Sequence, residues 1–400
     1  MSDNSNSTIS TVAVIGLGTM GAGIAEVFAK AGLEVIGIEY NDTALDRGRG
    51  IITKSTDRAV SKGKLSEADR DTLLGHITWS TSRNDVATAD LVVEAVNENI
   101  DLKQEIFRDV DAAAPEHAIL ATNTSSLSIT EIASVTKNPD RVLGVHFFNP
   151  APVQKLVEVI RTLHTRDDVI EQMVALLSSF GKAPIVCGDQ AGFIVNALLI
   201  PYMGSAIRLY NDGFCTREEL DEAMVGAGNP MGPLALSDLV GNDVTLAVCE
   251  RMYQQTKNPL QAPAPLLSQM VAAGFLGRKS GRGFYDYFEG VDNGPLVPPP
   301  PASRAGELPG RLLSEYLNEA LRMVQTNYAR PDDIDTGMAL GCRMPKPFDQ
   351  LAELGPREVL RLQQEVFAET AQPAHRPVRL LEELAAADDP QAALAQLRQR

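Results

Sequence analysis

The sequence predicts an α/β fold, a doubly wound parallel sheet, followed by two all-α helical domains that repeat each other. Residues 11–41 contain an apolar run, a glycine-rich turn, a helical pattern and a second apolar run, which is the order of a βαβ unit. Strand-like and helical runs then alternate as far as residue 188, as in a parallel sheet with helices on both faces. From residue 191 on, apolar residues recur at helical spacing, and β-branched runs are few.

The turn Gly16-Leu17-Gly18-Thr19-Met20-Gly21 is the first candidate binding site. Gly16 permits a sharp turn, Gly18 lets the backbone approach a pyrophosphate, and Gly21 lets the helix pack closely on the strand. The helix N-terminus, with Thr19 and Met20, then offers N–H groups to the phosphates. GxGxxG alone also occurs in ordinary turns, but here it follows a strand and opens a helix. The setting therefore favours a Rossmann-like dinucleotide site.

Glu39 ends the second apolar run, about 20 residues after the turn, where a carboxylate can accept both ribose hydroxyls. An acid at this position would repel a 2′-phosphate. The sequence therefore predicts NAD rather than NADP as the cofactor.

The bulk composition excludes several classes of protein. A chain of 400 residues suggests two or three domains, and a net charge of −16 argues against nucleic acid and anionic membranes as partners. No apolar run is long enough to span a bilayer, and residues 1–9 read as a flexible tail rather than a signal peptide. The four cysteines are far apart, so we expect reduced thiols, a cytoplasmic location and no metal site.

Residues 42–75 read as helical and charged, with basic side chains at Lys54, Arg58, Lys62 and Lys64. They form either a solvated helical hairpin or a basic lip for a phosphate-bearing ligand.

Strand-like runs follow at 91–95, 118–122 and 142–148, with helices at 101–113 and 128–134 between them. Ligands of such sheets bind at the carboxyl ends of the strands. Residues 123–126 and 146–150 both fall at those ends.

Two further β-rich runs, 156–160 and 183–186, complete a first domain of residues 10–188. A helical domain, 189–288, contains a long apolar helix at 193–211. A Pro-rich linker, 289–302, leads to a second helical domain, 303–400, whose residues after about 385 read as a polar helix or a frayed tail.

The two helical domains share a pattern. A shift of 114 positions without a gap places Tyr202, Asp221 and Gly241 on Tyr316, Asp335 and Gly355. The second domain is therefore a diverged copy of the first.

His146 and Glu158 are the candidate catalytic pair. His146 lies in an apolar strand, where a histidine is more often a satisfied core residue, but this strand ends at the ligand-binding edge. Glu158 lies in another apolar run, where a carboxylate is costly to bury without a partner. A carboxylate that holds a histidine in one tautomer produces a base able to remove the proton of an alcohol as hydride leaves. Ser125 and Asn196 could orient the substrate oxygen, although Ser125 could equally cap a helix and Asn196 be a satisfied core amide.

At this point the residues match a known family. The segments GLGTMGAGIAEVFAKAG (16–32), VVEAVNEN (92–99), ATNTSSL (121–127), GVHFFNPAPVQKLVEVI (144–160), DQAGFIVNALLIPY (189–202), GAGNPMGPLALSDLVG (226–241) and GRKSGRGFYDY (277–287) occur in order. The chain resembles the L-3-hydroxyacyl-CoA dehydrogenases, including the 3-hydroxybutyryl-CoA type, over residues 10–288. The resemblance implies reversible NAD-dependent oxidation of the 3-hydroxyl of an acyl-CoA, a step of fatty-acid metabolism and β-oxidation. It leaves acyl chain length, pathway and direction open.

The resemblance also implies roles for particular residues. His146 looks like the general base and Glu158 its orienting partner, while Ser125 and Asn196 resemble residues that hold the substrate oxygen. Further NAD contacts are implied for Glu98, Lys103, Asn149 and, more weakly, Lys279, and contacts to the CoA nucleotide for Ser55 and Lys62. The leading turn is GLG where many relatives have GGG, which leaves its glycine geometry intact.

The last hundred residues resemble a second helical copy found in longer relatives. Gly310 takes the position of Asn196 there, so this copy lacks the polar group and is expected to be structural. In short relatives the helical domain is the dimer interface, so a second copy could replace the partner. A monomer with an internal pseudo-dimer is favoured over a homodimer.

Two other functions were weighed. A β-hydroxyacid dehydrogenase of the 3-hydroxyisobutyrate or 6-phosphogluconate type would need a lysine on the interdomain helix, and residues 193–211 contain none. A non-catalytic, crystallin-like relative would be expected to lose site residues, and all four are present.

Overall fold

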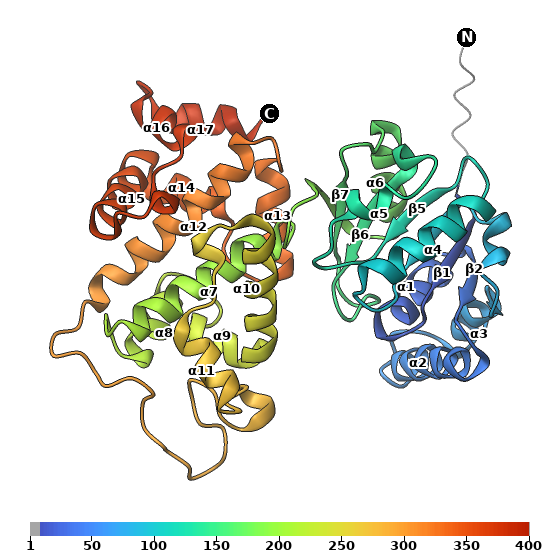
Figure 1. Ribbon diagram of the computed structural model, residues 1–400, viewed down its shortest axis with the longest axis horizontal. Coiled ribbons are helices and arrows are strands. Elements are labelled where there is room, and N and C mark those ends of the chain that lie inside the picture. The colour runs from blue at the N-terminus through green and yellow to red at the C-terminus, as the bar shows by residue number, and fades with distance from the viewer. Residues whose placement is uncertain (1–8, 400) are drawn as a thin grey trace. The chain divides into compact units, whose positions relative to one another are not determined.

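A computed structural model describes residues 9–399 of the chain. The chain forms two compact units, the first ending at Gln190 and the second beginning at Ala191 (Figure 1). Within the described residues, no helix is both long enough and apolar enough to cross a membrane. Most of the predicted tail, residues 1–8, lies outside the described part. Ile9 is buried in the core, and Ser10 donates from its backbone N and its hydroxyl to Asp90.

The first unit contains one eight-stranded sheet in the order β3-β2-β1-β4-β5-β6-β7-β8. Its strands are β1 (Thr11–Ile15), β2 (Glu34–Ile38), β3 (Ile77–Ser80), β4 (Leu91–Glu94), β5 (Ile119–Thr122), β6 (Val142–Phe147), β7 (Leu156–Arg161) and β8 (Ala183–Gly188). The strands from β1 to β6 are parallel, as predicted, but β7 is antiparallel to β6, and β8 runs with β7. The reversal follows from loop length, because residues 148–155 are too few for a parallel crossover.

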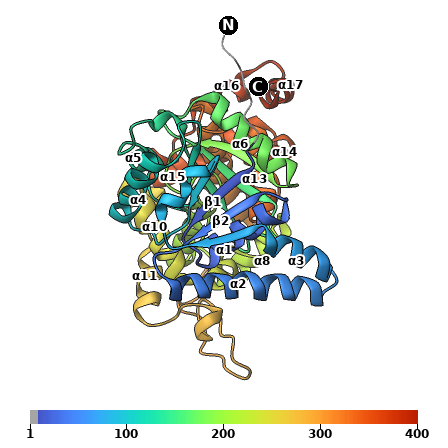
Figure 2. The ribbon, with the colours of Figure 1, turned by 90° about the vertical axis from the view of Figure 1, so that its right-hand side faces the viewer.

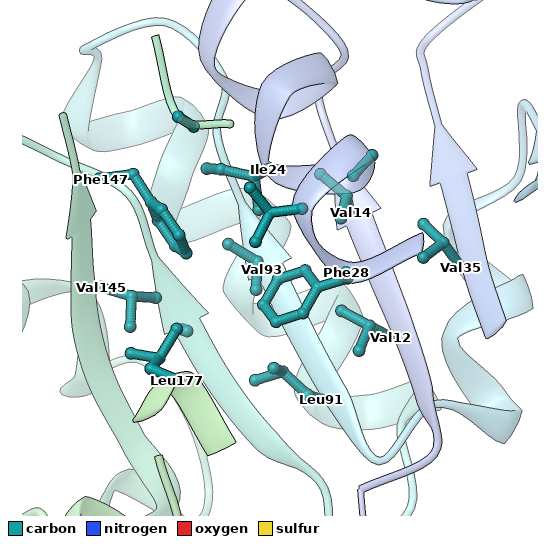
Figure 3. Close-up of a cluster of buried hydrophobic side chains, with 14 of the residues drawn as sticks. Val12, Val14, Ile24, Phe28, Val35, Leu91, Val93, Val145, Phe147 and Leu177 are labelled. Atoms are coloured by element: carbon teal, nitrogen blue, oxygen red, sulfur yellow. The ribbon is translucent and has the colours of Figure 1, made fainter. Parts of the chain in front are cut away.

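Helices cover both faces of this sheet. They are α1 (Thr19–Lys30), α2 (Asp42–Ser61), α3 (Glu67–Gly75), α4 (Ile100–Ala113), α5 (Ile129–Ala133) and α6 (Asp167–Ser179). Phe28 of α1 lies over Val12 and Leu91, and its ring meets that of Phe147 edge to face at 6.3 Å (Figure 3). Helices α2 and α3 pack on each other near β2, forming the predicted hairpin (Figure 1 and Figure 2).

The second unit is helical and repeats itself. The first set is α7 (Val195–Asn211), α8 (Arg217–Gly226), α9 (Pro233–Val240), α10 (Asn242–Thr256) and α11 (Pro265–Ala272); the second is α12 (Leu308–Gln325), α13 (Pro331–Gly341), α14 (Pro347–Leu354), α15 (Pro356–Thr370) and α16 (Arg379–Ala386). The bounds of α14, α15 and α16 are those of α9, α10 and α11 displaced by 114 positions. Helix α7 begins two residues later than the apolar pattern suggested, because Phe193 has a positive φ of 49°.

Equivalent aspartates stabilise equivalent turns in the two copies. Asp221 accepts hydrogen bonds from the backbone N of Leu234 and of Ala235, at the start of α9, and Asp335 accepts one from Phe348 N at the start of α14. In the first copy the hydroxyl of Tyr285 donates a further hydrogen bond to Asp221. In the second, Arg398 of a last helix, α17 (Pro390–Arg398), donates one to Asp335. The chain end is therefore a docked helix, with Leu394 and Leu397 buried, rather than a frayed tail.

The two copies pack together through α7 and α12. Tyr202 and Tyr316, which correspond in the two copies, meet edge to face with ring centroids 5.9 Å apart. Helix α7 also contacts α13, and α12 contacts α8. These two contacts are equivalent, because α12 corresponds to α7 and α13 corresponds to α8. Contacts between equivalent elements are those that a two-fold axis produces.

A buried polar cluster lies beside this interface. Ser205 donates to Oε2 of Glu315 at 2.7 Å, and Arg208 donates to the Ser205 hydroxyl at 3.1 Å. Burial raises the pKa of Glu315, whose Oε2 lies 3.7 Å from Nε2 of His375. Burial, with the nearby charges of Arg208 and Arg311, lowers the pKa of His375 to about 4.

Candidate functional site

The glycine turn has the geometry that its sequence predicts. Gly16 has a φ of 87°, and a Cβ there would lie 2.8 Å from Cγ1 of Val96. A Cβ at Gly21 would lie 1.7 Å from the carbonyl oxygen of Gly16, so neither position accepts another residue. A Cβ at Gly18 would meet nothing within 4 Å. The backbone at Gly18 therefore faces open space, as close approach to a ligand requires.

The N-terminus of α1, with Thr19 and Met20 in its first turn, lacks the features that usually satisfy a helix start. Among the described residues, no side chain caps it, and its first turn contains no acid. By contrast, Asn41 caps α2 and Asn99 caps α4. The first N–H groups of α1 and the positive end of its dipole thus remain available to an anion such as a pyrophosphate.

A cavity of about 370 Å³ opens beside this turn. Glu39 lines it and is held by two backbone donors, Leu17 N to Oε1 at 2.6 Å and Tyr40 N to Oε2 at 3.2 Å. The carboxylate is therefore fixed at the end of β2, where the ribose of a nucleotide would lie. The lining residues are Ile15, Gly16, Gly18, Ile38, Glu39, Tyr40, Arg83, Ala95, Val96, Asn97, Leu102 and Ile106. An apolar wall and one fixed carboxylate suit the adenosine of a dinucleotide.

Lys103, for which a contact to NAD is expected, is held inside the first unit by side-chain and backbone acceptors. Its side chain is fully enclosed, and Nζ donates to both oxygens of Glu94, at 2.7 and 2.9 Å, and to Val96 O at 3.3 Å. The ammonium has no exposed surface, and its three acceptors satisfy its donors. Glu94 also accepts from Val96 N and from the hydroxyl of Thr122. Lys103 therefore supports the loop after β4, and its contact with NAD stays a prediction.

Ser125 is held at the carboxyl end of β5 by the loop that follows β4. Its backbone N donates to Oε1 of Glu98 at 3.0 Å, and the hydroxyl of Thr124 donates to Oε2 at 2.7 Å. Asn123 joins the next strand, since its Oδ1 accepts from Phe147 N at 2.9 Å. Asn123 belongs to the segment 123–126 that was expected at the ligand-binding ends of the strands. These bonds fix Ser125 and the end of β6 to each other.

His146 and Glu158 are brought together as a cross-strand pair. They lie directly opposite each other in the antiparallel register of β6 and β7. Nδ1 of His146 is 2.6 Å from Oε2 of Glu158, and the glutamate is fully buried while 12% of the histidine side chain is exposed. The ring also lies against Phe148, with centroids 4.8 Å apart. The histidine ring therefore contacts a buried carboxylate on one side and remains partly exposed near the carboxyl end of β6.

The other predicted residues of the first unit lie near this edge or on the hairpin. Asn149 is exposed and lies two residues after the end of β6. Ser55 is half-buried in α2 and hydrogen-bonds the carboxyl of Glu26, whose pKa burial raises. Lys62 is exposed at the end of α2.

Asn196 and Lys279 belong to the second unit. Asn196 is half-buried in the first turn of α7, and Lys279 Nζ pairs with Oδ1 of Asp243 on α10 at 2.5 Å. Gly310 lies in the first turn of α12, where a Cβ would be 3.0 Å from the Leu362 side chain. The second copy therefore packs this position against its own α15.

An uncapped helix after a glycine turn, a fixed carboxylate at the end of β2 and a histidine–carboxylate pair at the same sheet edge are typical of an NAD-dependent dehydrogenase. The NAD-binding domain model of 3-hydroxyacyl-CoA dehydrogenase matches residues 11–190, and the C-terminal domain model of the same family matches residues 192–287 and 309–396. The chain belongs to the 3-hydroxyacyl-CoA dehydrogenase family. It is an oxidoreductase that acts on CH–OH groups, and its cofactor is NAD.

Several relatives are similar over most of their length. A 3-hydroxybutyryl-CoA dehydrogenase of Mycobacterium tuberculosis is 49% identical over 282 residues, which cover 70% of this chain and 99% of the relative. The mitochondrial hydroxyacyl-coenzyme A dehydrogenase of Homo sapiens is 45% identical over 285 residues, covering 69% of this chain and 90% of its own. The crystal structure of 3-hydroxybutyryl-CoA dehydrogenase from Escherichia coli K12 covers 94% of this chain and 98% of its own, with 32% identity and a TM-score of 0.85.

Proposed function

We propose that the chain interconverts (S)-3-hydroxyacyl-CoA and 3-ketoacyl-CoA, with His146 as general base and acid. The contact between Nδ1 of His146 and Oε2 of Glu158 at the ligand-binding edge of the sheet carries this proposal. The activities named for the M. tuberculosis and E. coli relatives support a short acyl-CoA such as the 3-hydroxybutyryl thioester as substrate.

The mechanism follows from the tautomer that Glu158 imposes. A carboxylate only accepts hydrogen bonds, so Nδ1 must carry a proton, and Nε2 becomes the basic nitrogen of the ring. Nε2 takes the proton of the 3-hydroxyl, and the positive charge that develops on the ring is stabilised by Glu158. Bound NAD supplies the hydride acceptor. Ser125 and Asn196 hold the substrate oxygen, and in the reverse direction His146 returns the proton.

The cofactor and substrate contacts are assigned to the remaining residues. Pyrophosphate binds at Gly16, Gly18, Thr19, Met20 and Gly21, the ribose at Glu39, and the nicotinamide end at Glu98, Asn149 and Lys279. The CoA nucleotide binds at Ser55 and Lys62, beside the basic residues of the α2–α3 hairpin. The four cysteines form no disulfide within the described residues, in keeping with a cytoplasmic enzyme.

The second helical copy, by this proposal, occupies the surface that a dimer partner would cover and leaves the chain a monomer. The contact between the equivalent residues Tyr202 and Tyr316 supports an internal pseudo-dimer. Among the described residues, Leu239, Val240 and Val244 of the first copy are exposed apolar side chains; the corresponding positions of the second are Glu353, Leu354 and Glu358. The first copy is thus the one adapted to bind an apolar acyl group.

The direct test is oxidation of NADH by the full chain with acetoacetyl-CoA and longer 3-ketoacyl-CoAs, repeated with NADPH. We expect rapid turnover with acetoacetyl-CoA and NADH and much slower turnover with NADPH. Turnover with 3-hydroxyisobutyrate and NAD but with no CoA thioester would contradict the proposal.

A further inference from the structure

Arg83 faces the adenosine cavity and has no role in the site described above. It is the first residue of a 3-10 helix, Arg83–Thr88, that connects β3 to β4. Among the residues that line the cavity, Arg83 and Glu39 are the charged ones. The guanidinium is therefore the positive group available to whatever binds beside the ribose carboxylate.

Two acids on α4 hold the guanidinium. Nη1 of Arg83 lies 2.9 Å from Oε1 of Glu105 and 2.6 Å from Oδ2 of Asp109. The acids are four positions apart on the helix, so they share a face and hold Arg83 from one side. The two pairs fix one end of the planar group and offset its charge, and Arg83 remains one of the residues that line the cavity.

This arrangement suits an adenine ring better than a phosphate. Leu102 and Ile106 give the cavity an apolar surface, and a guanidinium plane stacks on an aromatic face. A 2′-phosphate would meet the carboxylate of Glu39 and a guanidinium already paired with two acids. An unpaired guanidinium would instead attract that phosphate and weaken the preference for NAD over NADP.

We propose that Arg83 binds the adenine of NAD through its planar face, and that Glu105 and Asp109 neutralise it so that NADH is preferred over NADPH. The inference rests on the proposed function, because it places the cofactor in the same cavity.

The first test is direct binding of NADH and of ADP-ribose to the full chain by calorimetry, without turnover. Arg83→Ala should weaken both ligands about tenfold, the value of one cation–π contact. Arg83→Lys keeps the charge but loses the plane, and should weaken them nearly as much. The matched control is Arg70→Ala, since Arg70 also pairs with two acids, Asp57 and Asp71, but does not line the cavity. The stacking role would be overturned if Arg83→Ala left NADH affinity unchanged, or if Arg83→Lys kept the full NADH affinity of the wild type.

The second test changes only the charge. In the double variant Glu105→Gln/Asp109→Asn, the ratio of NADPH to NADH affinity should rise about tenfold or more, since a released guanidinium can pair with phosphate. The control Asp57→Asn/Asp71→Asn should leave that ratio unchanged. Both acids at Arg83 are more than half exposed, so the variants should fold. An unchanged ratio overturns the neutralising role. If the wild-type chain fails to bind NADH, the proposed function fails instead.

Discussion

Glu158→Gln tests the His146–Glu158 pair without removing the histidine. The amide has nearly the volume of the carboxylate and can still accept from Nδ1, so the ring stays in place. What is lost is the negative charge that stabilises the imidazolium as the substrate proton arrives. The effect should therefore appear in the chemical step.

The size of the effect follows from the geometry. With Nδ1 and Oε2 2.6 Å apart, the two charge centres are separated by roughly 4 Å. At an effective dielectric constant of about 20, opposite unit charges at that distance attract by about 4 kcal/mol. Glu158 is fully buried, so solvent does not screen it. Loss of about 4 kcal/mol from the transition state predicts a fall in kcat of about 10³-fold.

The assay compares kcat for oxidation of (S)-3-hydroxybutyryl-CoA by NAD, and NADH affinity by titration, in wild type and variant. NADH affinity should stay within about twofold, because Glu158 lies behind the histidine. Glu34→Gln is the matched control: Glu34 Oε1 is 2.8 Å from Nδ1 of His76, but the glutamate is 62% exposed. It should leave kcat unchanged. A Glu158→Gln enzyme with kcat within tenfold of wild type would refute the reasoning.

Three further outcomes are expected. Lys103→Met should destabilise the first unit by about 3–5 kcal/mol, because it leaves the buried Glu94 carboxylate unpaired. The double variant Lys103→Met/Glu94→Gln should recover part of the lost stability. An unchanged Tm of Lys103→Met in calorimetry would contradict this prediction. The stability of the second unit should fall by up to about 3 kcal/mol as pH drops from 6.5 to 4, because unfolded His375 takes up a proton that the folded residue, with its pKa of about 4, does not. His375→Gln, the residue found at the equivalent Gln261, should flatten that slope in urea unfolding at several pH values, and equal slopes would disprove the assignment. A chain that ends at residue 302 exposes the face of α7 that α12 covers and should dimerise or aggregate in light scattering; a stable monomer would exclude the pseudo-dimer.

Much of the fold could be predicted because its signals are local. At Gly16 and Gly21 of the turn, a Cβ would clash with neighbouring atoms, so both positions need glycine. The geometry of the turn can therefore be predicted from the spacing of its glycines. Strand direction cannot be predicted in this way, because an apolar run has the same sequence pattern in a parallel and in an antiparallel strand. The reversal at β7 was missed, although the short 148–155 loop contains the signal.

Candidate site residues can be predicted where polar residues occur in apolar runs, but the sequence does not show how deeply a side chain is buried. His146 and Glu158 stood out because each is costly in its strand, but only the register shows that they face each other. Lys103 has the motif of a cofactor contact, yet it is enclosed with Glu94, which a sequence pattern cannot reveal. Arg83 has no motif, and its position in the cavity depends on the packing of α4 against the β3–β4 connection.

The central claim, that His146 removes the substrate proton, is tested most directly by His146→Gln. The measurement is kcat for oxidation of (S)-3-hydroxybutyryl-CoA by NAD, together with NADH affinity on the same preparation, with His76→Gln as control. We predict a fall in kcat of about 10³-fold or more, with NADH affinity within about twofold of wild type and the control unchanged. Turnover within tenfold of wild type in His146→Gln would contradict the claim.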